Sequence, residues 1–336
     1  MSSTSLRVGL DLDGSLESLG NSMTDLADAL DRTGECELVR FRSRSSSQST
    51  NETHLAMRAL WSPLWRRSLG RSIDGLLPLV DVVHVAGIAT PPTLKIPLII
   101  SVDDLRPLRG ETQTHLRIAQ LRRAVQRGAT LVASSRSASH EVISVLGVAR
   151  SRVVVVPPAV PRVDATRVGT DLVVNITGVD ELFIELAPQL IAFSAQHGSR
   201  VVALASAAAG QKIRSSGLAV TIRSRHDARD ALANARVVMH LSDGARFPSF
   251  AIAALSAGVP TLARATEINR ELLEGAAALF ANDREVAETL EEVWTNAKRR
   301  SIMVAAGRSR AIDFAPDTAA RAYVSLYREV VRGWTA

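Results

Sequence analysis

The sequence predicts an α/β protein with two open parallel sheets, and three observations support this fold class. Short runs rich in Val, Ile and Leu alternate with segments whose apolar residues recur at helical spacing. Most of these runs are apolar at consecutive positions, which is typical of strands covered by helices on both faces. The alternation restarts after a proline-marked stretch, and 336 residues exceed the roughly 250 to 300 at which a single core usually stops growing.

The first half contains six runs that we expect to be strands: LRVGLDL, ELVRF, VDVVHVA, IPLIISV, ATLVAS and RVVVVP. Between them, helical spacing is found in NSMTDLADALDR, ETQTHLRIAQLRRAVQRG and SASHEVISVLG. Strands joined by helices in this way predict a doubly wound domain over residues 1–160.

The second half repeats the pattern. Its expected strands are DLVVNI, SRVVALA, LAVTI, RVVMHL, PTLAR and AALF, and its expected helices are ELFIELAPQLIAFSAQHG, DARDALANA, SFAIAALSAG and REVAETLEEVWTNAKRR. The proline-marked VPPAVPRVDATR lacks apolar periodicity and is the predicted linker. We expect a second domain over 161–315 and a final helix over 316–336. Tandem domains of this class predict a ligand cleft between the carboxyl ends of their strands.

The composition indicates which kinds of ligand and which cellular compartment to expect for this protein. The net charge is +6, and the 37 arginines and three lysines are spread along the whole chain. Aromatic residues make up only 4%, so nucleic-acid binding is not expected, whereas an anionic small molecule or lipid head group stays open. The single cysteine, Cys36, excludes a disulfide framework and a cysteine metal site and fits a reducing cytoplasm. No apolar run reaches the ~20 residues of a membrane span.

One segment has a composition that could contact the inner face of a membrane. LWSPLWRRSLGR joins two tryptophans to three arginines, Trp61, Trp65, Arg66, Arg67 and Arg71. Pro63 interrupts the run, so we favour tryptophans that pack on the sheet.

The stretch RVGLDLDGSL, residues 7–16, places Asp11 and Asp13 after an apolar run. It is similar to the DxDGT stretch of haloacid-dehalogenase-like phosphatases, whose first aspartate is the nucleophile. That chemistry also needs, in order, a Ser or Thr, a lysine and an acidic pair that holds Mg²⁺. Here the pair Asp103–Asp104 precedes the Ser-rich LVASS, and no such pair follows Lys212. The phosphatase is therefore a minor alternative. Capping a turn at the end of a strand explains Asp11 and Asp13 as well as contact with a ligand does.

A longer series of blocks runs through nearly the whole chain. GLDLDGSLESLGNSMTDLADAL, VDVVHVAG, IPLIISVDDLRPL and ATLVASSRSASHEVISVLGVARSRVVVVPPAVPR precede ANARVVMHLSDGARFPSFAIAALSAGVPTLARATEINRELLEGAAALFANDREVAETL. In order and spacing these blocks, with the closing DTAARAYVSLYREVVRG, resemble the retaining GT-B glycosyltransferases of family 4. The resemblance implies two Rossmann-like, doubly wound domains that face each other across a cleft.

The resemblance also implies an activity. Such enzymes move a sugar from a nucleotide diphosphate sugar, here UDP- or GDP-linked, to an acceptor hydroxyl, without a bound metal or another cofactor. Basic side chains and helix amino ends then neutralise the leaving diphosphate. The acceptor, a glycan, lipid or small molecule, is not identified, and a homo- or hetero-oligomer stays open.

The candidate site residues come from the matched blocks, except Lys212 and Arg223, which are possible substitutes for the family's diphosphate-binding residues. Two aspartates are implied as catalytic, Asp103 and Asp243. The donor-binding positions are Lys212, Arg223, Gly244, Arg246, Phe247 and Ser249, and Ser249 is also expected to cap the next helix. The acceptor-side positions are Gly20, Asn21, Asp104 and Ser135. His84 and His240 lie in apolar strands and are expected to be core histidines.

The chain departs from the family pattern at the donor side. The two glutamates that contact sugar and ribose are replaced by Ala245 and Ala253, and VVNITGVDELFIEL lacks the family's diphosphate-binding Arg and Lys. Arg214 and Arg225 are further candidate substitutes. Two hypotheses follow: an active, divergent glycosyltransferase, or a GT-B protein that has lost donor chemistry and acts as a binding or partner subunit.

Overall fold

The computed structural model describes residues 6–13, 16–17, 20–43, 53, 64–65, 69–77, 79–86, 90–102, 104–109, 114–164 and 169–334. Two compact units make up the chain. The first runs to Ala159, without Glu17–Gly20, and also takes in the C-terminal segment from Pro316; the second comprises Glu17–Gly20 and Val160–Ala315.

The first unit contains a six-stranded sheet of order β4-β1-β5-β6-β7-β8, and all its pairings are parallel. Its strands are β1 (Leu6–Asp11), β4 (Cys36–Phe41), β5 (Val82–Ala86), β6 (Leu98–Val102), β7 (Thr130–Ala133) and β8 (Val153–Val155). A two-stranded ribbon, β2 (Leu16–Glu17) and β3 (Gly20–Asn21), precedes the first helix. The expected strands of this half are therefore present and paired in parallel.

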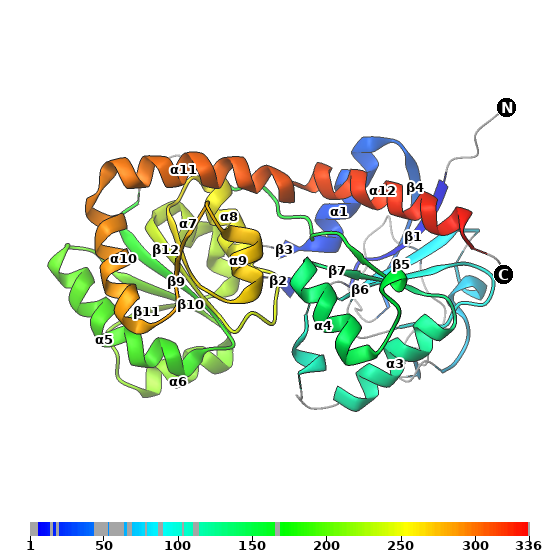
Figure 1. Cartoon of the computed structure of the whole chain (residues 1–336), viewed down its shortest axis with the longest axis horizontal. Helices are drawn as coiled ribbons and strands as arrows, with labels where there is room; N and C mark the ends of the chain where they lie inside the picture. The colour runs from blue at the N-terminus through cyan, green and yellow to red at the C-terminus, as the bar shows by residue number, and fades with distance from the viewer. Residues whose placement is uncertain are drawn as a thin grey trace. The chain divides into compact units, whose positions relative to one another are not determined.

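Helices cover both faces of this sheet. They are α1 (Ser22–Thr33), α3 (Thr114–Gln126), α4 (Arg136–Leu146) and α12 (Pro316–Arg332). The blue α1 and the red α12 lie side by side in Figure 1, and both pack on one face of the sheet. The other face packs against α3 and α4 and against Trp65, which is fully buried. Packing of Trp65 on the sheet confirms the interpretation favoured above, while Trp61, Arg66 and Arg67 lie outside the described residues.

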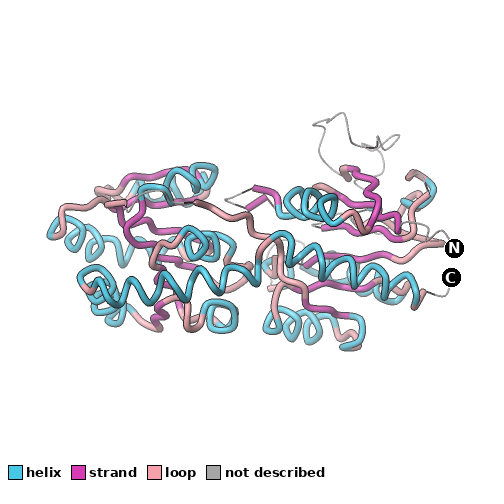
Figure 2. The backbone as a smooth tube through the Cα atoms, turned by 90° about the horizontal axis from the view of Figure 1, so that it is seen from above, coloured by secondary structure: helices cyan, strands magenta, loops and turns pink. Residues whose placement is uncertain are grey.

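The second unit has a six-stranded parallel sheet of order β11-β10-β9-β12-β13-β14. Its strands are β9 (Asp171–Thr177), β10 (Val201–Ala205), β11 (Thr221–Ser224), β12 (Ala235–Ser242), β13 (Thr261–Arg264) and β14 (Ala278–Phe280). Its helices are α5 (Asp180–Gln196), α6 (Ala207–Ser215), α7 (Ala228–Asn234), α8 (Ser249–Ala257), α9 (Glu267–Leu273), α10 (Asp283–Thr295) and α11 (Ala297–Ala311). Two separate apolar clusters, one on each face, show that helices cover both sides of this sheet (Figure 2).

One expected helix is two helices in the structure. The segment REVAETLEEVWTNAKRR is interrupted at Asn296, which ends α10 and caps α11 by accepting a hydrogen bond from the Arg299 amide. An asparagine side chain can replace the missing helical acceptor, so the chain can change direction at little cost. Among the described residues no helix is long and apolar enough to cross a membrane.

The strand orders place one switch point in each sheet. In the first unit the chain leaves β1 for β4 on one side, and β5 lies on the other side. In the second unit β9 is flanked by β10 on one side and β12 on the other. Loops that follow the two strands at such a point diverge and leave room for a ligand at the carboxyl edge. The loops after β9 and β12 are therefore the first place to look for a site.

Candidate functional site

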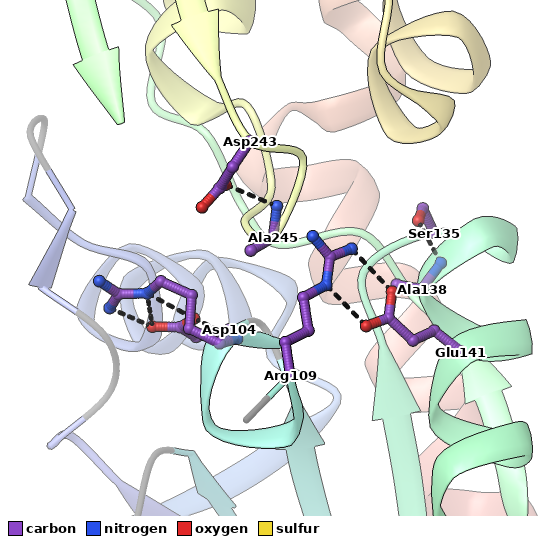
Figure 3. A network of polar contacts seen from close by, with 8 residues as sticks. Asp104, Arg109, Ser135, Ala138, Glu141, Asp243 and Ala245 are labelled. Atoms are coloured by element: carbon purple, nitrogen blue, oxygen red, sulfur yellow. Dashed lines mark hydrogen bonds and ion pairs between the residues drawn. The ribbon is translucent and has the colours of Figure 1, made fainter. Parts of the chain in front are cut away.

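The loops after β9 and β12 meet through Asp243 and Gly178. The Asp243 amide donates to the Thr177 carbonyl oxygen at 3.1 Å, and its Oδ1 accepts from the Ala245 amide at 2.8 Å (Figure 3). Gly178 follows Thr177 with a φ of 73°, and a Cβ on it would overlap the Asp243 carboxylate. The carboxylate can therefore occupy this position because residue 178 has no side chain.

The next residues continue the loop toward α8. Gly244 has a φ of 76°, and a Cβ on it would lie 3.0 Å from Cβ of Thr266, so this turn also requires glycine. Phe247 is 3% exposed and packs edge-to-face on Phe314, with ring centroids 5.8 Å apart. The Phe247 side chain is therefore hidden in the core, whereas the half-buried Arg246 keeps a partly exposed side chain.

The expectation that Ser249 caps α8 is wrong. The N-cap residue is Pro248, with no side-chain cap, and Ser249 is the first helical residue, its amide donating to the Phe247 carbonyl oxygen at 2.9 Å. Pro248 fixes the backbone one residue earlier than the expected cap, which draws Ser249 into the helix. Ser249 stays at the amino end of α8, close to the loop that contains Arg246.

The basic candidates differ in their surroundings. The Arg225 guanidinium donates to the Ile176 carbonyl oxygen at 2.5 Å, which brings this half-buried side chain to the end of β9. Arg223 lies on the edge strand β11 and is also half-buried. Arg214 bonds to the Gln211 side chain in the last turn of α6. Arg225 is therefore a basic side chain that contacts the switch point.

Lys212 is engaged by two acids. Its Nζ lies 2.9 Å from Glu181 and 3.6 Å from Asp180, both in the first turn of α5, and the hydrogen bond to Glu181 raises the pKa of Lys212. The two acidic side chains are also favourable at the amino end of α5, where the helix dipole is positive. The charge of Lys212 is thus balanced within the protein before any anion arrives.

A buried polar pair lies beneath this edge. The Asn175 side-chain amide lies 3.0 Å from His240 Nδ1, and both residues are 3% exposed. Burial lowers the pKa of His240 to about 4, and the nearby Arg225 charge acts in the same direction. His240 is therefore a neutral core histidine at physiological pH, as expected, and so is His84, whose pKa burial lowers to about 3.

In the first unit, Asp11 ends β1 and is fully buried. Its Oδ1 accepts from the amides of Asp13 at 3.0 Å and Ser43 at 3.2 Å, while burial raises its pKa to about 7. A carboxyl with no exposed surface cannot attack a phosphate, which argues against the phosphatase alternative. Of the acceptor-side positions, Gly20 and Asn21 form β3, directly before α1.

The loops after β6 and β7 carry ion pairs and a cap. Asp104 and Arg106 form a fork with contacts of 2.5 to 3.1 Å, and Asp103 lies outside the described residues. Ser135 is fully buried and caps α4, where its Oγ accepts from the Ala138 amide at 3.0 Å (Figure 3). Ser135 therefore has the structural task of capping α4, and its acceptor-side role stays a prediction.

Comparisons with known proteins identify the fold of the whole chain and a family match for its first half. Residues 19–162 match the family model described as Glycosyltransferase Family 4. No curated protein sequence matches the chain. Among solved structures, Anabaena HepE in complex with UDP and glucose has a TM-score of 0.68 at 14% identity and covers 96% of this chain and 100% of its own. The chain therefore has the GT-B fold, and its residues 19–162 are similar to glycosyltransferase family 4.

Two more structures agree with the GT-B fold. Sucrose-phosphate synthase from Thermosynechococcus elongatus has a TM-score of 0.67 at 13% identity, over 98% of this chain and 100% of that one. WaaG, a glycosyltransferase involved in lipopolysaccharide biosynthesis, has a TM-score of 0.66 at 13% identity, over 96% and 99%. These structures confirm the GT-B fold that the sequence blocks predict, and the family 4 match covers residues 19–162.

Ala245 and Ala253 stand where the sequence resemblance predicts a glutamate pair, and the structure shows what surrounds them. Ala245 is 1% exposed and Ala253, inside α8, is fully buried in the apolar cluster on that face. A glutamate at Ala253 would be placed among apolar side chains, which is unfavourable for a charge. The apolar side chains around Ala253 therefore suit an alanine and not a charged glutamate.

Sequence reasoning about this GT-B chain missed Gly178 and the pair formed by Arg109 and Glu141, whose two contacts measure 2.7 and 2.8 Å (Figure 3). A signal for Gly178 was present. The apolar run of β9 ends in Thr-Gly, directly before the acidic start of a helix. A glycine between a parallel strand and its helix often marks close approach to a second loop.

Proposed function

We propose that this chain transfers a sugar from a UDP- or GDP-linked donor to an acceptor hydroxyl, with retention of configuration and without a bound metal. The observation that carries the proposal is the Gly178–Asp243 junction at the switch point of the second sheet, where open α/β sheets bind ligands. The UDP and glucose bound to Anabaena HepE support the donor class.

In this proposal Asp243 binds the sugar hydroxyls, and Arg225 and Arg246 neutralise the diphosphate as it leaves. The backbone of Gly178 and Gly244 allows close approach of the phosphates, because neither residue presents a side chain. Ser249, Phe247, Arg223 and Lys212 complete the donor-side set. Asp103 and Asp243 are the proposed catalytic residues. Gly20, Asn21 and Asp104 are the proposed acceptor-side positions, and the fully buried Ser135 supports that side by capping α4.

Donor titration tests this proposal. UDP- and GDP-sugars should raise the melting temperature of the wild-type chain and should be turned over. Gly178→Ala should weaken donor binding by at least about tenfold, because the new Cβ displaces Asp243 from its contact with Ala245.

Gly198→Ala is the matched control, because Gly198 has a φ of 61° but nothing lies within 4 Å of an added Cβ. It has the same backbone cost without the clash, so donor binding should survive. Failure of every donor to stabilise the wild-type chain at millimolar concentration would overturn the proposal.

A second candidate function is a binding or partner subunit without donor chemistry. The engagement of Lys212 by Asp180 and Glu181 and the burial of Ala253 favour it, because both remove features that a diphosphate or ribose would use. This candidate predicts a flat donor titration together with co-purification of a second, intact glycosyltransferase. Steady turnover of a sugar nucleotide by the purified chain would exclude it.

A further inference from the structure

The charge of the first unit is concentrated in one stretch of the chain. Between residues 112 and 163 the sequence has eight arginines and a single acidic residue, Glu141. The Glu141 carboxylate is held by Arg109, which lies outside this stretch, through two contacts of 2.7 and 2.8 Å. The one negative charge of the stretch is therefore already balanced by an arginine that does not belong to it.

Five of these arginines gather at one edge of the unit. The ends of α3 and α4 meet there, since Arg122 donates to the carbonyl oxygens of Leu146 and Val145 at 2.7 and 3.1 Å. Arg152 donates to the Gly128 carbonyl oxygen at 3.1 Å, which joins the turn after α4 to the turn after α3. We call the exposed residues Arg122, Arg123, Arg127, Arg150 and Arg152 the arginine edge.

These bonds orient the side chains without removing their charge, because backbone carbonyls carry only partial charge. The arginines belong to the end of α3, which packs on α4, and to the short turn Arg150–Arg152 beyond α4, which the Arg152 bond joins to the turn after α3. Figure 1 labels both helices. A cluster of fixed, exposed cations on one edge attracts an extended anionic surface more strongly than a single small anion.

Apolar groups accompany the arginine edge. Trp334, which is half-buried, rests against Gly128, where an added Cβ would lie 2.7 Å from the indole ring. Leu116, on the exposed side of α3, is 57% exposed. Tryptophan favours the boundary between water and lipid because its ring is both apolar and polar. Cationic and apolar side chains together are typical of a surface that rests on a bilayer.

We propose that the arginine edge binds the surface of a bilayer that contains anionic phospholipids. Charge complementarity selects a polyanion, and the apolar side chains beside the cations favour a bilayer over a nucleic acid. The proposal does not depend on sugar transfer, because the arginine edge shares no residue with the donor side.

Co-sedimentation of the full chain with vesicles tests it. The chain should bind vesicles of phosphatidylcholine mixed with phosphatidylglycerol, should not bind phosphatidylcholine alone, and should be released by added salt. The double variant Arg127→Glu/Arg150→Glu should bind at least about tenfold more weakly, because the cations become anions.

The matched control is Arg284→Glu/Lys298→Glu, which makes the same change in net charge on exposed positions of α10 and α11. It should bind like the wild type. Equal binding by the arginine-edge variant, equal loss in the control, or wild-type binding to duplex DNA but not to anionic vesicles would each overturn the proposal. Should the arginine-edge variant unfold, salt-insensitive vesicle binding by the wild type would overturn it instead.

Discussion

The carboxyl group of Asp11 shows how burial sets the charge of a single residue. Its Oδ1 accepts two backbone hydrogen bonds, yet the residue has no exposed surface, so its pKa rises to about 7 instead of falling. Near neutral pH the folded chain therefore holds a proton on Asp11 that the unfolded chain has lost. Ionisation of this group opposes folding.

The sign of the effect can be tested. Between the ordinary pKa of 3.8 and about 7 the folded state binds more protons than the unfolded state, so the stability contributed by Asp11 falls as the pH rises through this window. Asp11→Asn removes the ionisation and keeps an acceptor, and should raise the free energy of unfolding at about pH 8 by roughly 2 to 4 kcal/mol. Urea unfolding of the wild type and of Asp11→Asn measures this difference in the free energy of unfolding.

Asp74→Asn is the control, because the pKa of Asp74 is shifted in the opposite direction to that of Asp11. Burial acts to raise the pKa of Asp74, but hydrogen bonds from the Lys95 and Leu94 amides outweigh it and the pKa is lowered. This substitution should not gain stability at about pH 8. If Asp11→Asn and the wild type share one pH dependence of unfolding, the raised pKa is wrong.

Individual site residues were only partly predictable from sequence. Asp243 and Gly244 were predicted because a sequence block places them after a strand. Gly178 was missed because its need for glycine comes from the Asp243 carboxylate, 65 positions further along the chain, and no local pattern contains that contact. Ser249 was misassigned because Pro248, a residue without a capping side chain, takes the cap position.

At the scale of elements, α12 is attached to the first sheet by a buried polar cluster. Tyr327 OH lies 2.8 Å from His84 Nδ1 on β5, and His84 Nε2 lies 2.8 Å from Ser101 Oγ on β6. Tyr323 OH is 3.2 Å from the same Ser101 oxygen, and its ring packs on His84 at 4.9 Å. The apolar face of α12 drives docking, and these bonds fix its register on the sheet.

Tyr327→Phe should lower the free energy of unfolding by about 1 to 3 kcal/mol, because it leaves the buried His84 Nδ1 without its partner. Ser325→Ala, at an exposed position of the same helix, should change it little, since Ser325 Oγ bonds only to the Arg321 carbonyl oxygen of its own helix. Thermal melts of the two variants give the comparison, and equal melting temperatures would contradict the argument.

Elements were the most predictable level. The strands of both sheets were foreseen because runs that are apolar on both faces have few alternatives to a buried parallel strand. The break at Asn296 was not foreseen, because the apolar spacing continues across it and only the side-chain bond to the Arg299 amide ends one helix and starts the next. Helix α6 was also missed, since its alanine-rich start has no strong periodicity.

At the scale of the whole molecule, the two units should respond differently to acid. A neutral buried histidine loses stability as the pH falls from 6.5 toward its folded pKa, about 3 for His84 and about 4 for His240. In the first unit Asp11 gains stability over the same window and offsets His84. In the second unit none of the resolved shifts of described groups opposes His240 in this window.

Acidification from about pH 7.5 to about pH 5 should therefore weaken the second unit more than the first. Hydrogen exchange of backbone amides, corrected for the intrinsic effect of pH, reports each unit separately. The second unit should lose protection on β9 and β12 while β1 and β5 change little. Equal loss in both units would show that the histidine and aspartate effects do not govern acid stability.

The attachment of α12 to the first unit has a consequence for biosynthesis. Residues Tyr323 and Tyr327 complete the apolar face formed by α1, β1 and β5, yet they are translated after the entire second unit. A ribosome that has made only the first half has released a sheet with one face covered by α1 but not by α12, so the second unit is the first that can finish folding. Nascent chains stalled before Pro316 should accordingly need chaperone protection of that face.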